Sequence, residues 1–213
     1  MKVFYYYHIS KCGGTFVYEN LRSLARQLSS SFLSFSSLKG PSSPSQDNID
    51  KLSSFLNEDL LARIVKNKFI GNKYLFIHHH HRFPGLKTTL PHIKKCAAEL
   101  ERDRHELYLL TTVREPSGWL KSKINYNNQR KETKLDFENY SSSLYDGQAK
   151  YLLYNSSSWD MESPLSDKDL EDLKVILESV DGLYTVDDIG RLEADLRGWI
   201  PEEFDWNASK RNV

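Results

Sequence analysis

Four short segments of the chain are apolar and rich in β-branched and aromatic residues. They span residues 3–7, 74–77, 107–113 and 182–186. Such runs are typical of strands buried on both faces of a parallel sheet. Apolar residues recur at helical spacing within residues 16–28, 49–65, 90–104, 170–177 and 189–199. The alternation of strands and helices predicts an α/β fold whose mainly parallel sheet has about four to five strands flanked by helices.

Two polar segments interrupt this pattern. Ser29–Asp47 is rich in serine and contains two prolines and a glycine. It is too polar to pack on its own, so we expect a surface loop or flap, either a tolerated insertion or a substrate lid. Asn125–Lys134 is polar and basic and is also expected to be a surface loop. Both belong to the single domain, residues 1–213, that a chain of this length predicts.

Composition restricts the compartment and the partners. Lysine plus arginine equals aspartate plus glutamate at 29 each, so no overall field draws the protein to nucleic acid or to an anionic membrane. The chain begins with its first predicted strand and has no apolar run long enough to span a bilayer, so we expect a cytoplasmic protein without a membrane span. Cys12 and Cys96 form neither a disulfide framework nor a metal-ligand pattern, which agrees with a reducing compartment.

The turn between the first strand and the first helix has the features of an anion site. Gly13 and Gly14 let the backbone approach a ligand, and the first amides of the helix point into the turn. Lys11 adds positive charge and Thr15 adds a hydroxyl. A Walker A loop does not fit, because the lysine precedes the glycine pair. A tyrosine-phosphatase loop does not fit either, since the sixth residue after Cys12 is a tyrosine and not an arginine.

A second anion site is predicted where the 107–113 strand ends. Arg114 follows that strand directly, and Pro116 suits the first turn of a helix that would carry Ser122 two turns later. A nucleotide triphosphatase needs an aspartate at such a strand end to hold magnesium. The arginine therefore favours a metal-free anion clamp.

A run of four histidines, residues 78–81, follows the 74–77 strand and would lie in the same crevice, beyond the carboxyl ends of the strands. Imidazole titrates near neutral pH, so this run is the candidate source of a general base. In a continued strand His78 and His80 share one face, whereas His79 and His81 share the other. A zinc site is a poor alternative, because one strand cannot supply three ligands. Glu19 on the first helix is the reserve base.

Both anion sites resemble those of the sulfotransferases that use 3′-phosphoadenosine 5′-phosphosulfate (PAPS). The likeness is to carbohydrate O-sulfotransferases of the heparan sulfate 2-O-sulfotransferase type and their bacterial relatives. Their first loop reads Pro-Lys-Thr-Gly-Gly-Thr, and this chain has Ser10-Lys11-Cys12-Gly13-Gly14-Thr15. Their second site is Arg-Asp-Pro with a serine eight residues after the arginine, and this chain has Arg114-Glu115-Pro116 and Ser122. The departures are serine for proline, cysteine for threonine and glutamate for aspartate.

The resemblance implies a P-loop-like three-layer fold and an O-sulfotransferase with PAPS as sulfuryl donor and no required metal. The acceptor would be a hydroxyl, in a carbohydrate first and in a peptide tyrosine second. The family's His-x-His pair implies His80 as the base, with His78 as second choice, and Lys11 would neutralise the leaving oxygen. The alternative is a P-loop-like nucleotide-binding protein or kinase without sulfotransferase activity. The donor-binding residues implied are Lys11, Cys12, Gly13, Gly14 and Thr15 for the phosphosulfate, Arg114 and Ser122 for the 3′-phosphate, and Gln148 in a Gln-x-x-x-Leu helix near the nucleotide.

Overall fold

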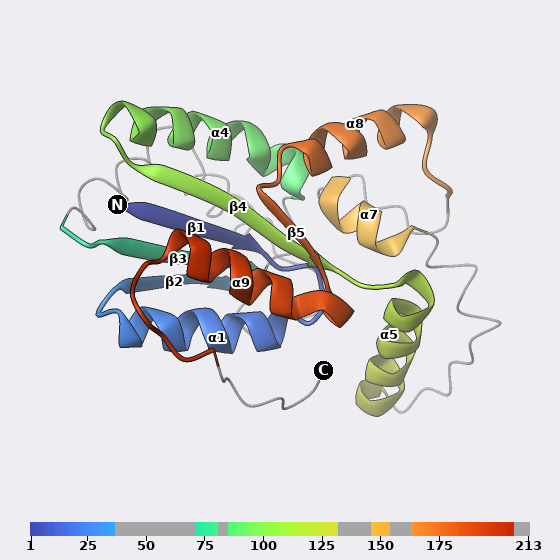
Figure 1. Cartoon of the computed structure of the whole chain (residues 1–213). Helices are drawn as coiled ribbons and strands as arrows, with labels where there is room; N and C mark the ends of the chain where they lie inside the picture. Colours follow the sequence, from blue (N-terminus) through green and yellow to red (C-terminus); the bar gives the residue numbers. More distant parts are fainter. Residues whose placement is uncertain (37–70, 81–84, 132–145, 154–162, 207–213) are drawn as a thin grey trace.

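The computed structural model describes residues 1–36, 71–80, 85–131, 146–153 and 163–206 (Figure 1). The described residues form a five-stranded sheet of order β2-β3-β1-β4-β5 in which every pairing is parallel. The predicted α/β class with a mainly parallel sheet of four to five strands is confirmed. The strands are β1 Lys2–Tyr7, β2 Ser31–Ser36, β3 Tyr74–His80, β4 Glu106–Val113 and β5 Gly182–Thr185. The helices of eight or more residues are α1 Gly14–Gln27, α4 Leu86–Arg102, α5 Pro116–Lys131, α8 Asp167–Glu178 and α9 Ile189–Trp199, and the shorter ones are α7 Gly147–Leu153 and the 3-10 turn η2 Val186–Asp188.

The central strand β1 divides the core into two halves. Val3, Tyr5 and Tyr7 pack into the half covered by α4, α7 and α8, whereas Phe4 and Tyr6 pack into the half covered by α1 and α9 (Figure 1). All five of these side chains are completely buried. Burial on both faces explains why the strand has no polar alternation.

Three predictions from the sequence need correction. Part of the expected 29–47 loop is the strand β2, which pairs with β3 from Ser31 to Ser36. An edge strand needs only one hydrogen-bonding neighbour and only one well-covered face. Serines are therefore tolerated in β2, and the polar composition of this segment did not predict a strand. The helix α5 continues to Lys131, through residues expected to form a loop, and α4 begins at Leu86 and not near residue 90.

The predicted helix within 49–65 and the position of His81 lie outside the described residues. Elsewhere in the described residues, the strands and helices predicted from the spacing of apolar residues are present. The helix α8 begins with a capping box, in which Ser166 and Asp169 are hydrogen-bonded to each other's backbone.

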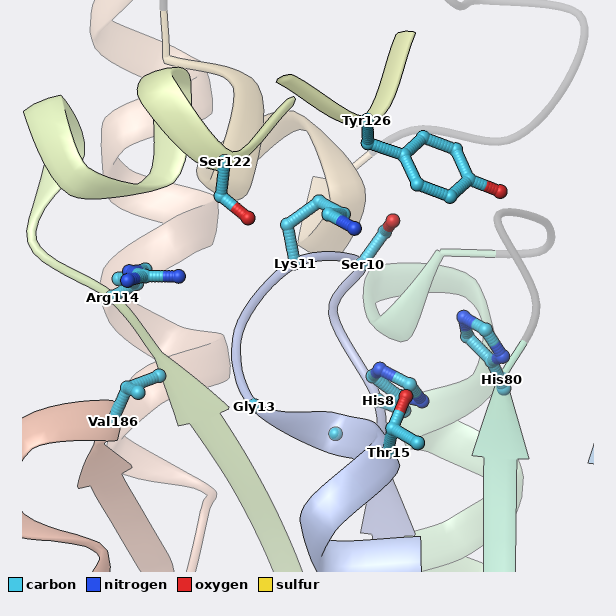
Figure 2. Close-up of a pocket in the computed structure, with 11 residues that line it drawn as sticks. His8, Ser10, Lys11, Gly13, Thr15, His80, Arg114, Ser122, Tyr126 and Val186 are labelled. Atoms are coloured by element: carbon cyan, nitrogen blue, oxygen red, sulfur yellow. The ribbon is translucent and has the colours of Figure 1, made fainter. Parts of the chain in front are cut away.

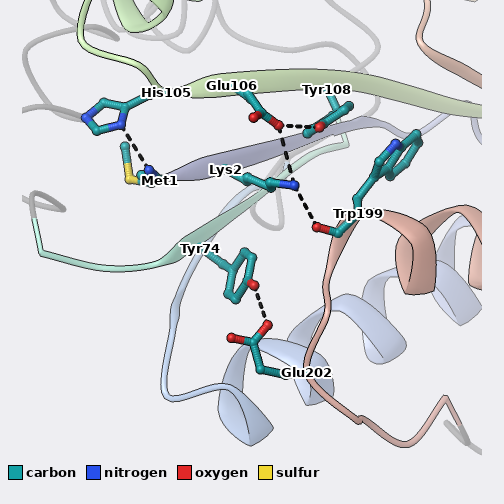
Figure 3. Close-up of polar contacts among 8 residues, drawn as sticks. All are labelled: Met1, Lys2, Tyr74, His105, Glu106, Tyr108, Trp199 and Glu202. Atoms are coloured by element: carbon teal, nitrogen blue, oxygen red, sulfur yellow. Dashed lines mark hydrogen bonds and ion pairs between the residues drawn. The ribbon is translucent and has the colours of Figure 1, made fainter.

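A polar network closes the amino ends of the strands (Figure 3). The Lys2 ammonium donates to the backbone oxygen of Trp199 at 2.8 Å and lies 3.5 Å from the Glu106 carboxylate. The Tyr74 hydroxyl donates to Glu202. These contacts join β1, β3 and β4 to the end of α9 and to the residues that follow it.

Among the described residues, no helix combines the length and the apolarity needed to cross a bilayer.

Candidate functional site

A pocket opens beyond the carboxyl ends of the central strands (Figure 2). It gathers side chains from the loop after β1, the end of β3, the loop after β4 and the helix α5. No aspartate or glutamate lines it among the described residues. Its lining residues that the sequence singled out are Lys11, Gly13, Gly14, Thr15, His80, Arg114 and Ser122, and those that it did not are His8, Ser10, Tyr126 and Val186.

Two side-chain hydrogen bonds hold the backbone of the loop before α1 in place. The Trp119 indole donates to the Ser10 carbonyl at 2.8 Å, and the Thr112 hydroxyl donates to the Cys12 carbonyl at 2.7 Å. Lys11 and Gly13 have φ of 68° and 71°, which curls the backbone around the pocket. Gly13 caps α1 without a side-chain hydrogen bond, so the first amides of the helix remain available to an anion.

The second loop presents Arg114 to the same pocket. Gln148 clamps its backbone, because the amide oxygen accepts from the Arg114 N–H and the amide nitrogen donates to the Arg114 carbonyl, both at 2.8 Å. The Glu115 carboxylate accepts from the amides of Ser117 and Gly118 and so caps α5. A hydrogen bond from the Ser117 hydroxyl, together with those from the two amides, lowers the pKa of Glu115. The glutamate therefore fills the role of a helix cap beside the arginine.

Two of the predicted donor-binding residues do not line the pocket. The side chain of Cys12 is buried in the core, and its thiol donates to the Gln148 amide oxygen at 3.0 Å. Gln148 thus contacts Cys12 of one loop and Arg114 of the other, and both of its amide atoms are engaged in these contacts. The two side chains connect the two loops behind the pocket and do not line it, so a role of either residue in donor binding stays a prediction.

Burial raises the pKa of the Cys12 thiol to about 12, so it stays protonated at neutral pH. If the two loops bind the nucleotide that the sequence predicts, Cys12→Ser should preserve its affinity, since a hydroxyl can make the same hydrogen bond to Gln148. Calorimetry with 3′,5′-bisphosphoadenosine (PAP) measures the affinity, and Cys96→Ser is the matched buried control. We also expect iodoacetamide to leave Cys12 unmodified in the folded protein. Rapid alkylation of Cys12 would contradict this account, because it would indicate a reactive thiolate that could act as a nucleophile.

The histidines of β3 separate by face as the sequence predicts. His79 is fully buried on the α4 side, where its Nδ1 lies 2.7 Å from the Tyr5 hydroxyl. His78 and His80 lie on the α1 side, but only His80 lines the pocket. His78 is 3% exposed, and burial together with the neighbouring His80 lowers its pKa to about 3. His80 is therefore the better placed of the two predicted bases.

The reserve base, Glu19, is exposed on α1 and does not line the pocket. His8 does line it, at the last position before the loop, although the histidine run drew attention to β3 alone. The sequence contained a signal for His8, since a histidine directly after a central strand lies at the same edge of a parallel sheet as a histidine at the end of β3.

No family model matches the chain, and no curated protein matches it. Among solved structures, a fungal RNA kinase matches with 14% sequence identity and a TM-score of 0.35, over 96% of this chain and 90% of that chain. A likeness at this level carries no inference about function.

Proposed function

We propose that the protein transfers a sulfuryl group from PAPS to an acceptor hydroxyl. One observation carries the proposal. Arg114 and Ser122, which lie about a hundred residues from the first loop in sequence, line the same pocket as Lys11 and the head of α1. PAPS has two anionic groups, and each would meet a separate cluster of donors.

Each donor cluster fits one end of PAPS. The amides at the head of α1, the Lys11 ammonium and the Thr15 hydroxyl would hold the 5′-phosphosulfate. Arg114, with a guanidinium suited to bidentate contact with phosphate, and Ser122 would hold the 3′-phosphate. The Gln148 clamp on the Arg114 backbone keeps the second cluster in place relative to the first.

The reaction is an in-line displacement. The acceptor oxygen forms a bond to sulfur while the bond from sulfur to the 5′-phosphate oxygen breaks, and its electron pair leaves with the phosphate of PAP. The acceptor proton goes to the imidazole of His80, and Lys11 stabilises the charge that develops on the leaving oxygen. A carbohydrate hydroxyl is the first candidate acceptor and a peptide tyrosine is the second.

Phosphoryl transfer from a nucleoside triphosphate is the competing function. It relies on magnesium, which carboxylates hold in kinases and NTPases. Among the residues that the structure describes, the pocket has no such carboxylate, and a basic residue follows β4. This composition favours a donor that needs no metal.

The test is a comparison of PAP with ADP, which lacks the 3′-phosphate. We expect calorimetry to give tighter binding of PAP, with no effect of EDTA. Arg114→Ala should erase that preference, because a charged phosphate contact is worth roughly 10- to 100-fold in affinity. Arg102→Ala, an exposed arginine on α4 outside the pocket, is the control. Loss of PAP binding in EDTA, or an unchanged preference in Arg114→Ala, would refute the proposal.

A further inference from the structure

The side chain of His8 is a buried polar group at the anion site that the proposed mechanism does not use. It is 6% exposed, yet its ring lines the pocket between Thr15 and His80 (Figure 2). A β-carbon on Gly14, the first residue of α1, would lie 1.9 Å from the His8 Nε2. This edge of the imidazole therefore rests directly against the head of the helix, where an anion would bind.

A hydrogen-bonded chain across three strands fixes the orientation of the ring. His8 Nδ1 lies 3.1 Å from His78 Nε2, and His78 Nδ1 lies 3.1 Å from the Ser34 hydroxyl oxygen. Because His8 Nδ1 contacts His78, Nε2 is the ring nitrogen of His8 that can bind a ligand in the pocket. Ser34 on β2 and His78 on β3 thus position a side chain that follows β1.

We infer that His8 Nε2 donates a hydrogen bond to the anionic group bound at the head of α1. The inference rests on the proposed function only for the identity of that anion, since the 5′-phosphate of any adenine nucleotide would occupy the same place. Gly14 makes the contact possible, because any larger residue would displace the imidazole from the helix.

The hydrogen-bonded chain can supply the required tautomer. If the Ser34 hydroxyl donates to His78 Nδ1, the proton of His78 is on Nε2 and is donated to His8 Nδ1, so a neutral His8 carries its proton on Nε2. Burial, together with His80, His78 and Lys11, holds the pKa of His8 well below its usual value. His8 therefore adds a donor without adding a further positive charge beside Lys11 and the helix N-terminus.

A neutral His8 also suits the neighbouring base. The rings of His8 and His80 are stacked, with centroids 3.8 Å apart and an interplanar angle of 17°. When His80 takes the acceptor proton, its charge stacks on a neutral ring and does not face a second cation. The two imidazoles thus have separate roles, one as a donor to the anion and one as a base.

The first experiment measures PAP and ADP binding by calorimetry. We expect His8→Ala to weaken both ligands to the same extent, by roughly 10- to 100-fold, because the lost hydrogen bond goes to a charged group that the two share. Arg114→Ala weakens PAP alone, so the two variants are distinguished. His8→Gln, which retains a side-chain N–H, should recover part of the affinity. His79→Gln is the matched control, since this buried histidine lies on the opposite face of β3.

Equal ADP affinity in the wild type and in His8→Ala would overturn the inference. A wild type that binds neither PAP nor ADP would overturn it as well. If the wild type binds PAP and ADP equally while His8→Ala weakens both, the sulfotransferase proposal fails but this inference stands.

The second experiment is independent of binding strength. Imidazole ¹⁵N shifts of the PAP-bound wild type should show His8 neutral with its proton on Nε2. In Ser34→Ala the fixed tautomer should be lost, because His78 Nδ1 no longer has its donor. A His8 that is protonated only on Nδ1 would overturn the inference even if the alanine variant does not fold.

Discussion

Replacing His80 with alanine should lower the turnover number by about 100- to 10,000-fold, the range for loss of a general base. The affinity for PAP should change little, since in the proposed complex the anion contacts would come from other groups, at the head of α1 and at Arg114. His80 is the histidine of β3 that lines the pocket, whereas His78 is buried behind it. Transfer of labelled sulfate from PAPS to a panel of oligosaccharides and a tyrosine peptide measures turnover, and calorimetry measures PAP affinity.

His92→Ala is the control for His80→Ala, because this half-buried histidine of α4 does not line the pocket. His92→Ala should keep wild-type turnover. If His80→Ala also keeps turnover near that of the wild type, His80 is not the base. If the same variant loses PAP affinity as steeply as turnover, the imidazole binds the donor and the proton acceptor lies elsewhere.

Replacing Lys11 with alanine should weaken both binding and catalysis. Its ammonium lies 4.0 Å from the ring centroid of Tyr126, across the pocket from the head of α1 (Figure 2). In the proposed reaction, a charge there would meet the phosphosulfate in the ground state and the leaving oxygen in the transition state. We expect PAP affinity to fall roughly 10- to 100-fold and the turnover number to fall by a further factor of about 100 to 1,000.

Lys11→Arg separates charge from geometry. It keeps the charge and changes the shape of the donor, so PAP affinity should be retained better than turnover. Lys121→Ala, an exposed lysine of α5 next to Ser122, controls for a general loss of positive charge near the site. Wild-type turnover in Lys11→Ala would remove the first loop from the mechanism.

The local pattern of the chain was sufficient for much of the fold. The completely apolar β1, the helical spacing of Val17, Leu21 and Leu24, and the Gly13-Gly14 turn between them each depend on neighbours within a few residues, so periodicity predicted them. The strand β2 depends on pairing with β3, about 40 residues away, and no local pattern carries that information.

The same division holds for the site. The sequence was sufficient to predict that Lys11 and Arg114 follow strands that end at one edge of a parallel sheet, because strand direction follows from the α/β alternation. The folded structure was needed to show that Gln148 and Cys12 lie behind the pocket, that His80 lines it while His78 does not, and that His8 also lines it. Those placements depend on which side chains from β1, β2, β3 and α7 meet in the folded protein. His8 and His78 are 70 positions apart in the sequence, and Cys12 and Gln148 are 136 positions apart, so no local pattern predicts these contacts.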